Sequence, residues 1–172
     1  MTEIATRPTG SEASTGDDPG LAAWRTFLQA HATLVRLLEA ELEADGLVSL
    51  SDYDVLVHLA AAPGRRLRMS ELAEVVVLSR SGMTRRIDRL EAVGFVRRDE
   101  CAADRRGAFA TLTEAGLTAL EETRPRYVRG VAEHFISRLT PHDLELLRTA
   151  LSKVLAAGDL AAPDGGTCEG RP

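Results

Sequence analysis

Apolar residues recur at intervals of three and four over most of the chain, a spacing that predicts a mainly helical protein. A first long helix is expected from about residue 21 to a stop at Asp45-Gly46. The second helix is expected to begin at a Ser51 cap and to end at the Pro63-Gly64 break. A short third helix is expected to follow a Ser70 cap.

A fourth helix is expected between a Ser79 cap and a Gly94 stop. Its apolar stripe consists of Met83, Ile87, Leu90 and Val93. Its outward side carries Ser81, Thr84, Arg85 and Asp88, flanked by Arg80, Arg86 and Arg89. Such side chains can bond phosphates and base edges, but a charged helix face is more often simply solvated. Because only a few residues separate this helix from the third one, the two together predict a helix-turn-helix.

Beyond Gly94 the pattern changes to the alternation of apolar and polar residues that is typical of β-strands. Residues 95–98 are expected to form the first strand and residues 108–112 the returning strand. Residues 101–107 are expected to form the turn between them. Arg105 and Arg106 would then lie at the tip of a β-hairpin, where an arginine can enter a DNA minor groove; an ordinary basic turn is the alternative. The combined pattern predicts a winged helix-turn-helix, mainly α with a small β-hairpin wing.

Two further helices are expected after the hairpin. Thr113 is a candidate cap for the first, and Pro125 is expected to bend it or to limit its regularity. The run Thr140-Pro141-x-Asp143 is expected to start the second. Their apolar positions are Leu117, Leu120, Val128, Val131 and Phe135, then Leu144, Leu147, Leu151, Val154 and Leu155.

A reading head of about residues 51–112 is too small to cover the apolar stripes of its flanking helices. We therefore expect the N- and C-terminal helices, at about residues 21–45 and 113–157, to be dimerisation helices that pack on a twin subunit. A helix bundle within one chain is the alternative.

The 172 residues are 44% hydrophobic and 27% charged, which suits one ordinary globular core. Residues 1–20 and 158–172 are polar, so both are expected to be disordered tails on a single domain at 21–157. The formal net charge is −5, but residues 64–106 hold eleven Arg against seven Asp and Glu, a local +4 that leaves −9 elsewhere. This segregation concentrates positive potential on the predicted reading head.

The sequence lacks the signatures of several other protein classes. No apolar run approaches the roughly 18 residues of a membrane span, and no signal core is visible, so a cytoplasmic protein without membrane contact is expected. Cys101 and Cys168 form no CxxC pair and the four histidines show no metal-ligand spacing, so neither metal nor cofactor is expected. No phosphate loop, GxSxG or HExxH motif is present, so an enzyme is not expected.

The segment from 21 to 157 resembles the multiple antibiotic resistance regulator (MarR) family of bacterial transcription factors. Four motifs carry the resemblance: Ser70-Glu71-Leu72-Ala73, the run LSRSGMTRRIDRLE at 78–91, Gly94-Phe95-Val96-Arg97-Arg98, and Asp104-x-Arg106 followed by Leu112-Thr113-Glu114-Ala115-Gly116. The resemblance implies a homodimer whose terminal helices interlock and whose two winged heads straddle an inverted-repeat operator in double-stranded DNA. Half-sites about 10 bp apart are expected.

The resemblance also implies which side chains serve DNA binding. Arg106 matches the family's wing arginine that enters the minor groove, and Asp104 matches the acid that braces the hairpin. The complete set of expected DNA-binding residues is Ser70, Ser79, Arg80, Ser81, Thr84, Arg85, Arg86, Arg89, Asp104, Arg105 and Arg106.

Members of the family commonly bind a small aromatic or phenolic anion between the dimer helices and the reading head. The candidates to line such a pocket here, with ordinary core packing as the alternative, are Trp24, Phe27, His31, Tyr53 and His58. The expected function is a sequence-specific, homodimeric transcriptional repressor that such a ligand releases from its operator. Two alternatives are a winged-helix protein-interaction module and a redox-responsive regulator that acts through Cys101.

Overall fold

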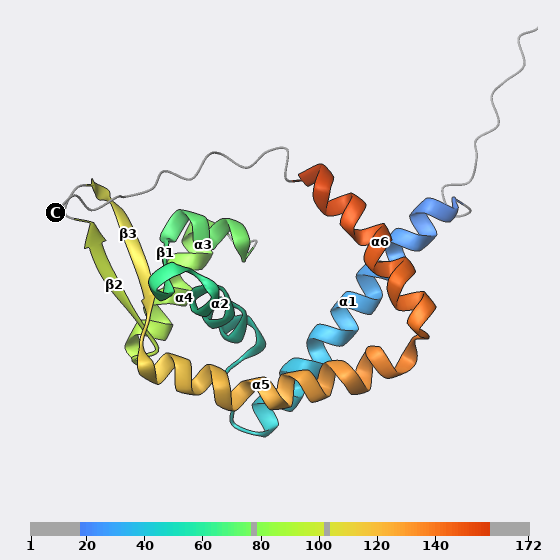
Figure 1. Ribbon diagram of the computed structural model, residues 1–172, viewed down its shortest axis with the longest axis horizontal. Helices are drawn as coiled ribbons and strands as arrows, with labels where there is room; N and C mark the ends of the chain where they lie inside the picture. The colour runs from blue at the N-terminus through green and yellow to red at the C-terminus, as the bar shows by residue number, and fades with distance from the viewer. Residues whose placement is uncertain (1–17, 77–78, 102–103, 159–172) are drawn as a thin grey trace, which may run out of the picture.

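The computed structural model describes residues 18–76, 79–101 and 104–158, which form a mainly helical fold with one small antiparallel sheet (Figure 1). This agrees with the predicted fold class. The elements are α1 (Pro19–Ala44), α2 (Leu50–Ala61), η1 (Pro63–Arg65), β1 (Arg66–Arg68), α3 (Met69–Val75), α4 (Arg80–Ala92), β2 (Val96–Cys101), β3 (Asp104–Leu112), α5 (Glu114–His134), η2 (Ile136–Arg138) and α6 (Pro141–Gly158). The sheet lies with α2, α3 and α4 at one end, α1 and α6 lie at the other, and α5 runs between the two ends.

Hydrogen bonds at the helix starts identify the residue that begins each helix. Ser79 caps α4 as predicted, because its Oγ accepts the Gly82 N–H at 3.1 Å. The predicted Ser51 cap of α2 is wrong, because Ser49 accepts the Asp52 N–H at 3.1 Å. Ser49 has the extended backbone that a cap requires (ψ 147°), whereas Ser51 already lies inside the helix.

The predicted Ser70 cap of α3 is wrong for the same reason. α3 begins at Met69, and the extended residue before it is Arg68, whose N–H donates to Glu71 Oε2 at 3.1 Å. Ser70 is exposed within the first turn. A carboxylate that reaches back to the start of the helix here replaces a serine cap.

The sheet has the strand order β1-β3-β2 and is antiparallel throughout. The short strand β1, which was not predicted, pairs with β3 from Arg66 opposite Thr111 to Arg68 opposite Phe109. Three residues are too few to show an alternating pattern in the sequence, so only the contact with β3 reveals this strand.

The wing turn is shorter than predicted, since β2 extends to Cys101 and β3 already begins at Asp104. The backbone of Arg105 and Arg106 therefore belongs to β3 and does not form the turn. Glu100 pairs with Ala108 but Cys101 pairs with Asp104, so residues 105–107 form a bulge in the ladder. A bulge of this kind lets two strands of unequal length stay paired beyond the expected turn.

The hydrophobic core lies between α2, α3, α4 and the sheet. Its fully buried members include Val55, Leu56, Leu59, Leu72, Met83, Ile87, Leu90, Val96 and Ala110. The predicted stripe of α4 is confirmed except at Val93, which is 56% exposed. Val93 is the residue at which α4 stops, so the chain turns away before this side chain reaches the core.

The start of α5 is locked onto the end of α4 and the start of the wing. Thr113 caps α5 as predicted: its Oγ1 accepts the Gly116 N–H at 3.0 Å and donates to Gly94 O at 2.7 Å. The Thr113 N–H donates to Phe95 O at 3.0 Å. A Cβ at Gly116 would lie 2.1 Å from Phe95 O. Position 116 therefore has room for glycine alone.

α5 is helical from Glu114 to His134, with Pro125 inside it, and ends one residue before the expected Phe135. It crosses α1 closely at the buried Gly130, where a Cβ would lie 2.6 Å from Leu38 Cδ2. α1 itself begins at Pro19, because the Asp18 carboxylate accepts the Gly20 N–H at 2.7 Å. Pro19 and Gly20 thus belong to the helix and Asp18 caps it, although the sequence predicts a tail there. The other predicted tail residues lie outside the described part, apart from Gly158 at the end of α6.

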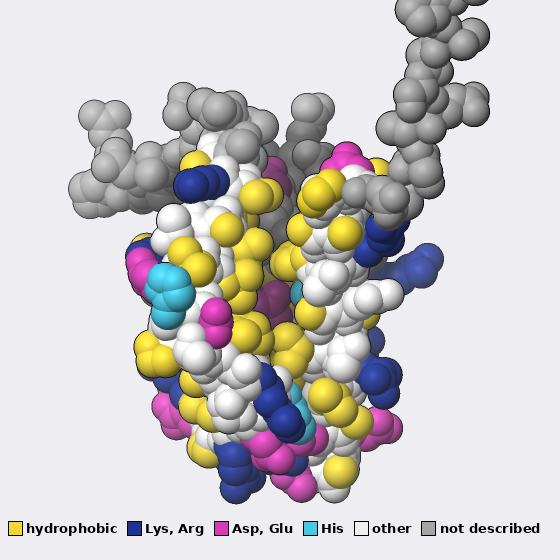
Figure 2. All heavy atoms as spheres, turned by 90° about the vertical axis from the view of Figure 1, so that its right-hand side faces the viewer, with side chains coloured by type: hydrophobic (Ala, Val, Ile, Leu, Met, Phe, Trp, Pro, Cys, Tyr) yellow, Lys and Arg dark blue, Asp and Glu magenta, His cyan; other side chains and the backbone are white. Residues whose placement is uncertain are grey.

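The outer helices leave much apolar surface uncovered within one chain. Figure 2 shows apolar side chains on the facing sides of two columns of atoms, with a gap between the columns. The most exposed large apolar side chains of the two helices are Leu21, Trp24, Phe27, Leu28 and Val35 on α1, and Leu146, Val154 and Leu155 on α6. α6 starts as predicted, with Thr140 Oγ1 accepting the Asp143 N–H at 3.2 Å.

We expect Gly116→Ala to lower the free energy of unfolding by about 1–3 kcal/mol, because the new methyl group overlaps a backbone carbonyl that cannot rotate away. Urea unfolding followed by circular dichroism measures the change. Glu121→Ala, at an exposed position of the same helix, is the matched control and should stay within about 0.5 kcal/mol of wild type. Equal stability of Gly116→Ala and wild type would contradict the close contact.

Candidate nucleic-acid interface

The exposed side of α4 presents short polar side chains and, among the described residues, one arginine without an ion pair. Ser79, Ser81, Thr84 and Arg85 are all exposed, as the sequence predicts. Arg85 forms no ion pair with any residue that the structure describes, so its guanidinium is available to an external partner. The side chain of Arg80 lies outside the described part.

Arg86 does not share this outward position. Its side chain is only 19% exposed, and its Nη1 lies 3.1 Å from Asp52 Oδ1 on α2. The predicted contact of Arg86 with DNA stays a prediction, and in this structure the side chain turns back to compensate a buried carboxylate. Arg89 also binds Asp52, at 2.6 Å, but its side chain is 57% exposed. The hydrogen bond and the charge of Asp52 raise the pKa of the Arg89 guanidinium above its usual value.

A second arginine, Arg98 on β2, holds the other side of α4. Its Nη2 donates to Thr84 O at 3.2 Å and pairs with Asp88, and its Nη1 donates to Glu91 Oε2 at 3.2 Å. The Arg98 N–H also donates to Glu91 Oε1 at 3.2 Å. These contacts join α4 to the base of the wing. No local pattern in the sequence indicates this role of Arg98, because the alternation around it predicts only a strand.

The base of the wing carries further polar contacts. Thr111 Oγ1 donates to Asp99 Oδ2 at 2.7 Å, and Arg97 Nη2 lies 3.3 Å from the same oxygen. On the other edge of the sheet, the guanidinium of Arg66 lies over the Phe109 ring, 4.1 Å from its centre. The side chains of Asp104, Arg105 and Arg106 lie outside the described part, so their DNA contacts stay predictions.

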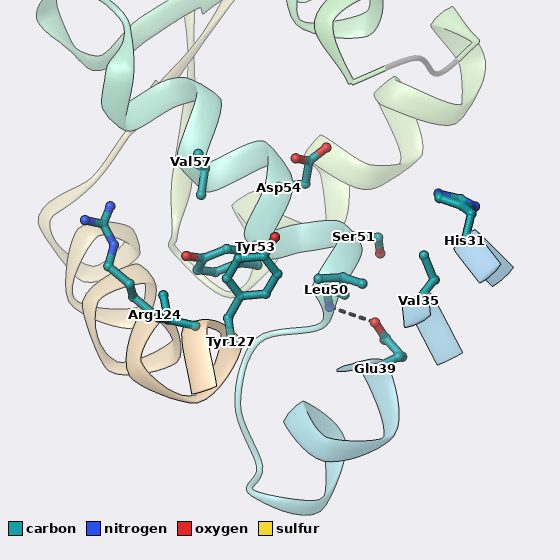
Figure 3. Close-up of a pocket in the computed structure, with 11 residues that line it drawn as sticks. His31, Val35, Glu39, Leu50, Ser51, Tyr53, Asp54, Val57, Arg124 and Tyr127 are labelled. Atoms are coloured by element: carbon teal, nitrogen blue, oxygen red, sulfur yellow. Dashed lines mark hydrogen bonds between the residues drawn. The ribbon is translucent and has the colours of Figure 1, made fainter. Parts of the chain in front are cut away.

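A pocket of about 640 Å³ lies between α1, α2 and α5 (Figure 3). Tyr53 and Tyr127 pack against each other at its centre, with ring centres 4.8 Å apart and ring planes tilted by 36°, and Arg124 lies to one side of them. The lining residues are His31, Val35, Glu39, Leu50, Ser51, Tyr53, Asp54, Val57, Arg124, Tyr127 and Val128. Burial raises the pKa of the Tyr53 hydroxyl.

Only two of the five predicted ligand-binding residues, His31 and Tyr53, line this pocket. Trp24 and Phe27 stack on each other at 5.8 Å on the exposed side of α1, with 54% and 40% of their surface exposed. His58 lies 3.7 Å from Asp54, outside the lining. The pocket instead contains Arg124 and Tyr127 from α5, which no local pattern in the sequence links to α2.

One group of side chains has the spacing of metal ligands. Ligand atoms of Glu41, Glu133 and His134 lie within 4.8 Å of one another. Glu41 is already paired, because it accepts from His134 Nε2 at 2.6 Å and lies 3.1 Å from Arg126 Nη1. The hydrogen bond from His134 and the charge of Arg126 lower the pKa of Glu41. An ion-pair cluster that joins α1 to α5 accounts for these contacts.

In the part of the chain that the structure describes, every helix is too short or too polar to span a membrane.

Comparisons with known proteins agree with this architecture. Residues 48–107 match the sequence model of the MarR family. The transcriptional regulator HosA of Escherichia coli is 31% identical over 103 residues, which cover 60% of this chain and 74% of that protein.

Two solved structures from Streptomyces coelicolor are more similar over a longer span. The MarR family transcriptional regulator AbsC is 38% identical, with a TM-score of 0.74 over 88% of this chain and 97% of that one. The MarR family regulator Sco3205, solved in complex with DNA, is 35% identical, with a TM-score of 0.76 over 87% of this chain and 92% of that one.

Proteins of this kind are transcriptional regulators and not enzymes, in agreement with the prediction from the sequence. The motifs, the braced recognition helix, the wing and the similarity to AbsC over almost its full length lead to the same assignment. The chain belongs to the MarR family of transcriptional regulators.

Proposed function

We propose that the protein is a sequence-specific, double-stranded DNA-binding repressor that acts as a homodimer on an inverted repeat. The observation that carries the proposal is the exposed side of α4, where Arg85 has no ion-pair partner among the described residues and Arg98 holds the helix against the wing. The side chains of an exposed, rigidly held helix can enter a major groove and read base edges. The complex of the similar protein Sco3205 with DNA supports the same role here.

The proposed DNA contacts divide by element. On α4, Ser79, Ser81, Thr84, Arg85 and Arg89 are exposed and would contact phosphates and base edges in the major groove. Ser70 is exposed at the start of α3 and would contact a phosphate. Arg80, Arg105 and Arg106 are proposed on the family resemblance, with Arg106 in the minor groove and Asp104 bracing the wing.

Loss of a major-groove arginine should weaken the complex specifically. We expect Arg85→Ala to lower affinity for a duplex selected by the wild-type protein at least about fivefold, because one good arginine–base contact contributes about 1–3 kcal/mol. We expect Arg106→Ala to lower it as well. Electrophoretic retardation at two salt concentrations, with scrambled competitor, measures both effects.

Arg129→Ala is the control for the loss of charge, since Arg129 is exposed on α5 and has no hydrogen bond or ion pair with another described residue. It should change affinity by less than about twofold. Equal weakening by Arg85→Ala and Arg129→Ala would point to general electrostatics and not to a reading helix. Full affinity without Arg85 and Arg106 would favour a protein-interaction module.

The dimer is proposed from the uncovered apolar side chains of α1 and α6. Large apolar side chains at 38–69% exposure along two helices form apolar surface of the kind that marks a protein–protein contact. A second copy of the chain would cover both helices through a two-fold axis. On this proposal, residues of about 51–112 form the reading head, and residues of about 21–45 and 113–157 form the dimer contact.

A charge in this patch should dissociate the dimer. We expect Leu28→Asp to convert the protein to a monomer in sedimentation velocity, because it buries an unpaired carboxylate in an apolar contact. Trp24, the only tryptophan, reports the same event through a red shift of its fluorescence. Thr33→Asp puts the same charge on the opposite side of α1 and should leave the dimer intact. A wild-type protein that sediments as a monomer would contradict the proposal.

The effector proposal rests on the pocket between α1, α2 and α5. Its tilted Tyr53–Tyr127 pair offers an apolar surface to an aromatic ring, and Arg124 offers a charge to an anion. A small aromatic or phenolic anion bound there would release the operator.

Benzoate is a suitable probe for this pocket. At ten times its dissociation constant it should stabilise the wild-type fold by about 1.4 kcal/mol, seen as a higher midpoint of thermal unfolding. Arg124→Ala should abolish this shift, whereas Arg129→Ala, which removes the same charge from the same helix, should retain it. An equal shift in the two variants, or none in wild type, would contradict the proposed pocket.

A further inference from the structure

Asp52 is a buried carboxylate on α2 that faces α4. The residue is 8% exposed, and its backbone N–H is already bonded to Ser49 at the helix start. Its side chain points toward α4, where its Oδ1 accepts hydrogen bonds from both Arg86 and Arg89. A single carboxylate thus compensates two guanidinium groups on α4, across 34 and 37 residues of sequence.

The two arginines stand in different surroundings, although they share this acceptor. Arg86 is mostly buried, and its Nε has no hydrogen-bond acceptor in the part of the chain that the structure describes. Asp52 therefore supplies the compensating charge for Arg86. Arg89 is more than half exposed and lies one helical turn after Arg85, so the two share one side of α4.

We propose that Asp52 is a positioning residue for DNA recognition: it withdraws Arg86 from the DNA surface and fixes the Arg89 guanidinium in the orientation that contacts DNA. The inference rests on the proposed DNA-binding function. Only Nη2 of Arg89 is held by Asp52 at 2.6 Å, which leaves the other donors of its planar fork for an external acceptor.

Removal of this carboxylate has two effects, and both reduce sequence discrimination. An Arg89 side chain without Asp52 samples many rotamers, so a contact with one particular DNA sequence loses its preorganisation. Arg86 and Arg89 also become uncompensated cations, which strengthens attraction to any phosphate backbone. Asp52 is therefore expected to favour specific over non-specific DNA binding, although its negative charge offsets part of the positive charge of α4.

Asp52 also lies between residues that line the pocket. Its neighbours Ser51, Tyr53 and Asp54 face the pocket while Asp52 faces α4, so a single helical turn contacts both sites. A ligand that displaces this turn would displace the acceptor that holds Arg89. The same helical turn thus lies between the proposed effector pocket and α4.

The test compares Asp52→Asn with wild type on two duplexes, one selected by the wild-type protein from a random pool and one with the same composition in scrambled order. Asp52→Asn should lower the ratio of specific to non-specific affinity at least about fivefold, with non-specific affinity unchanged or higher. A purely structural role would reduce the active fraction and leave the ratio unchanged. Glu74→Gln removes the same charge from an exposed position on α3 and should preserve the ratio.

Two further variants complete the test. If Asp52→Asn does not fold, Asp52→Glu retains the charge but moves the carboxylate by one methylene, and it should also lower the ratio. In an Arg89→Gln background, Asp52→Asn should cause little further loss of the ratio, because the side chain that it positions is gone.

The outcomes separate this inference from the proposed function. A wild-type protein that prefers its selected duplex while Asp52→Asn keeps the same ratio would overturn the positioning role alone. Additive losses in the double variant would also overturn it. A wild-type protein without any sequence preference would overturn the proposed function and the inference together.

Discussion

The structure depends on how α4 is held, because this helix carries mostly polar side chains and presents little apolar surface. Met83, Ile87 and Leu90 anchor one side of it in the core. Ion pairs provide the rest: Asp52 binds it from α2, and Arg98 binds it from β2. Because each pair joins α4 to a different element, the helix cannot rotate without breaking at least one of them. The polar surface that remains free is therefore presented in one orientation.

Local signals in the sequence predict the parts of this fold that depend on local chemistry. Ser79 and Gly94 bound α4, and Thr113 caps α5, because caps and left-handed stops act within a few residues. Where two serines lie close together, as at Ser49 and Ser51, side-chain type cannot identify the cap, since backbone conformation decides it. The contacts of Asp52 with α4 depend on packing between distant elements, and no periodicity in the sequence predicts them.

The same distinction applies to the candidate sites. The exposed side of α4 follows from its 3.6-residue period, but the inward turn of Arg86 depends on a carboxylate 34 residues away. Aromatic residues close together on α1 predicted a pocket there, yet Trp24 and Phe27 are exposed while Tyr127 from α5 completes the pocket. Proximity along one helix is a weak guide to a pocket, because three helices build it.

On the proposed function, α4 of each subunit reads a major groove. Methylation interference on a duplex selected by the protein is the decisive measurement, because methylated guanine N7 blocks major-groove contacts. Interference is expected in two clusters related by an inverted repeat, with centres about 10 bp apart. Interference that is absent, or uniform along the duplex, would contradict it and would indicate binding through the phosphate backbone alone.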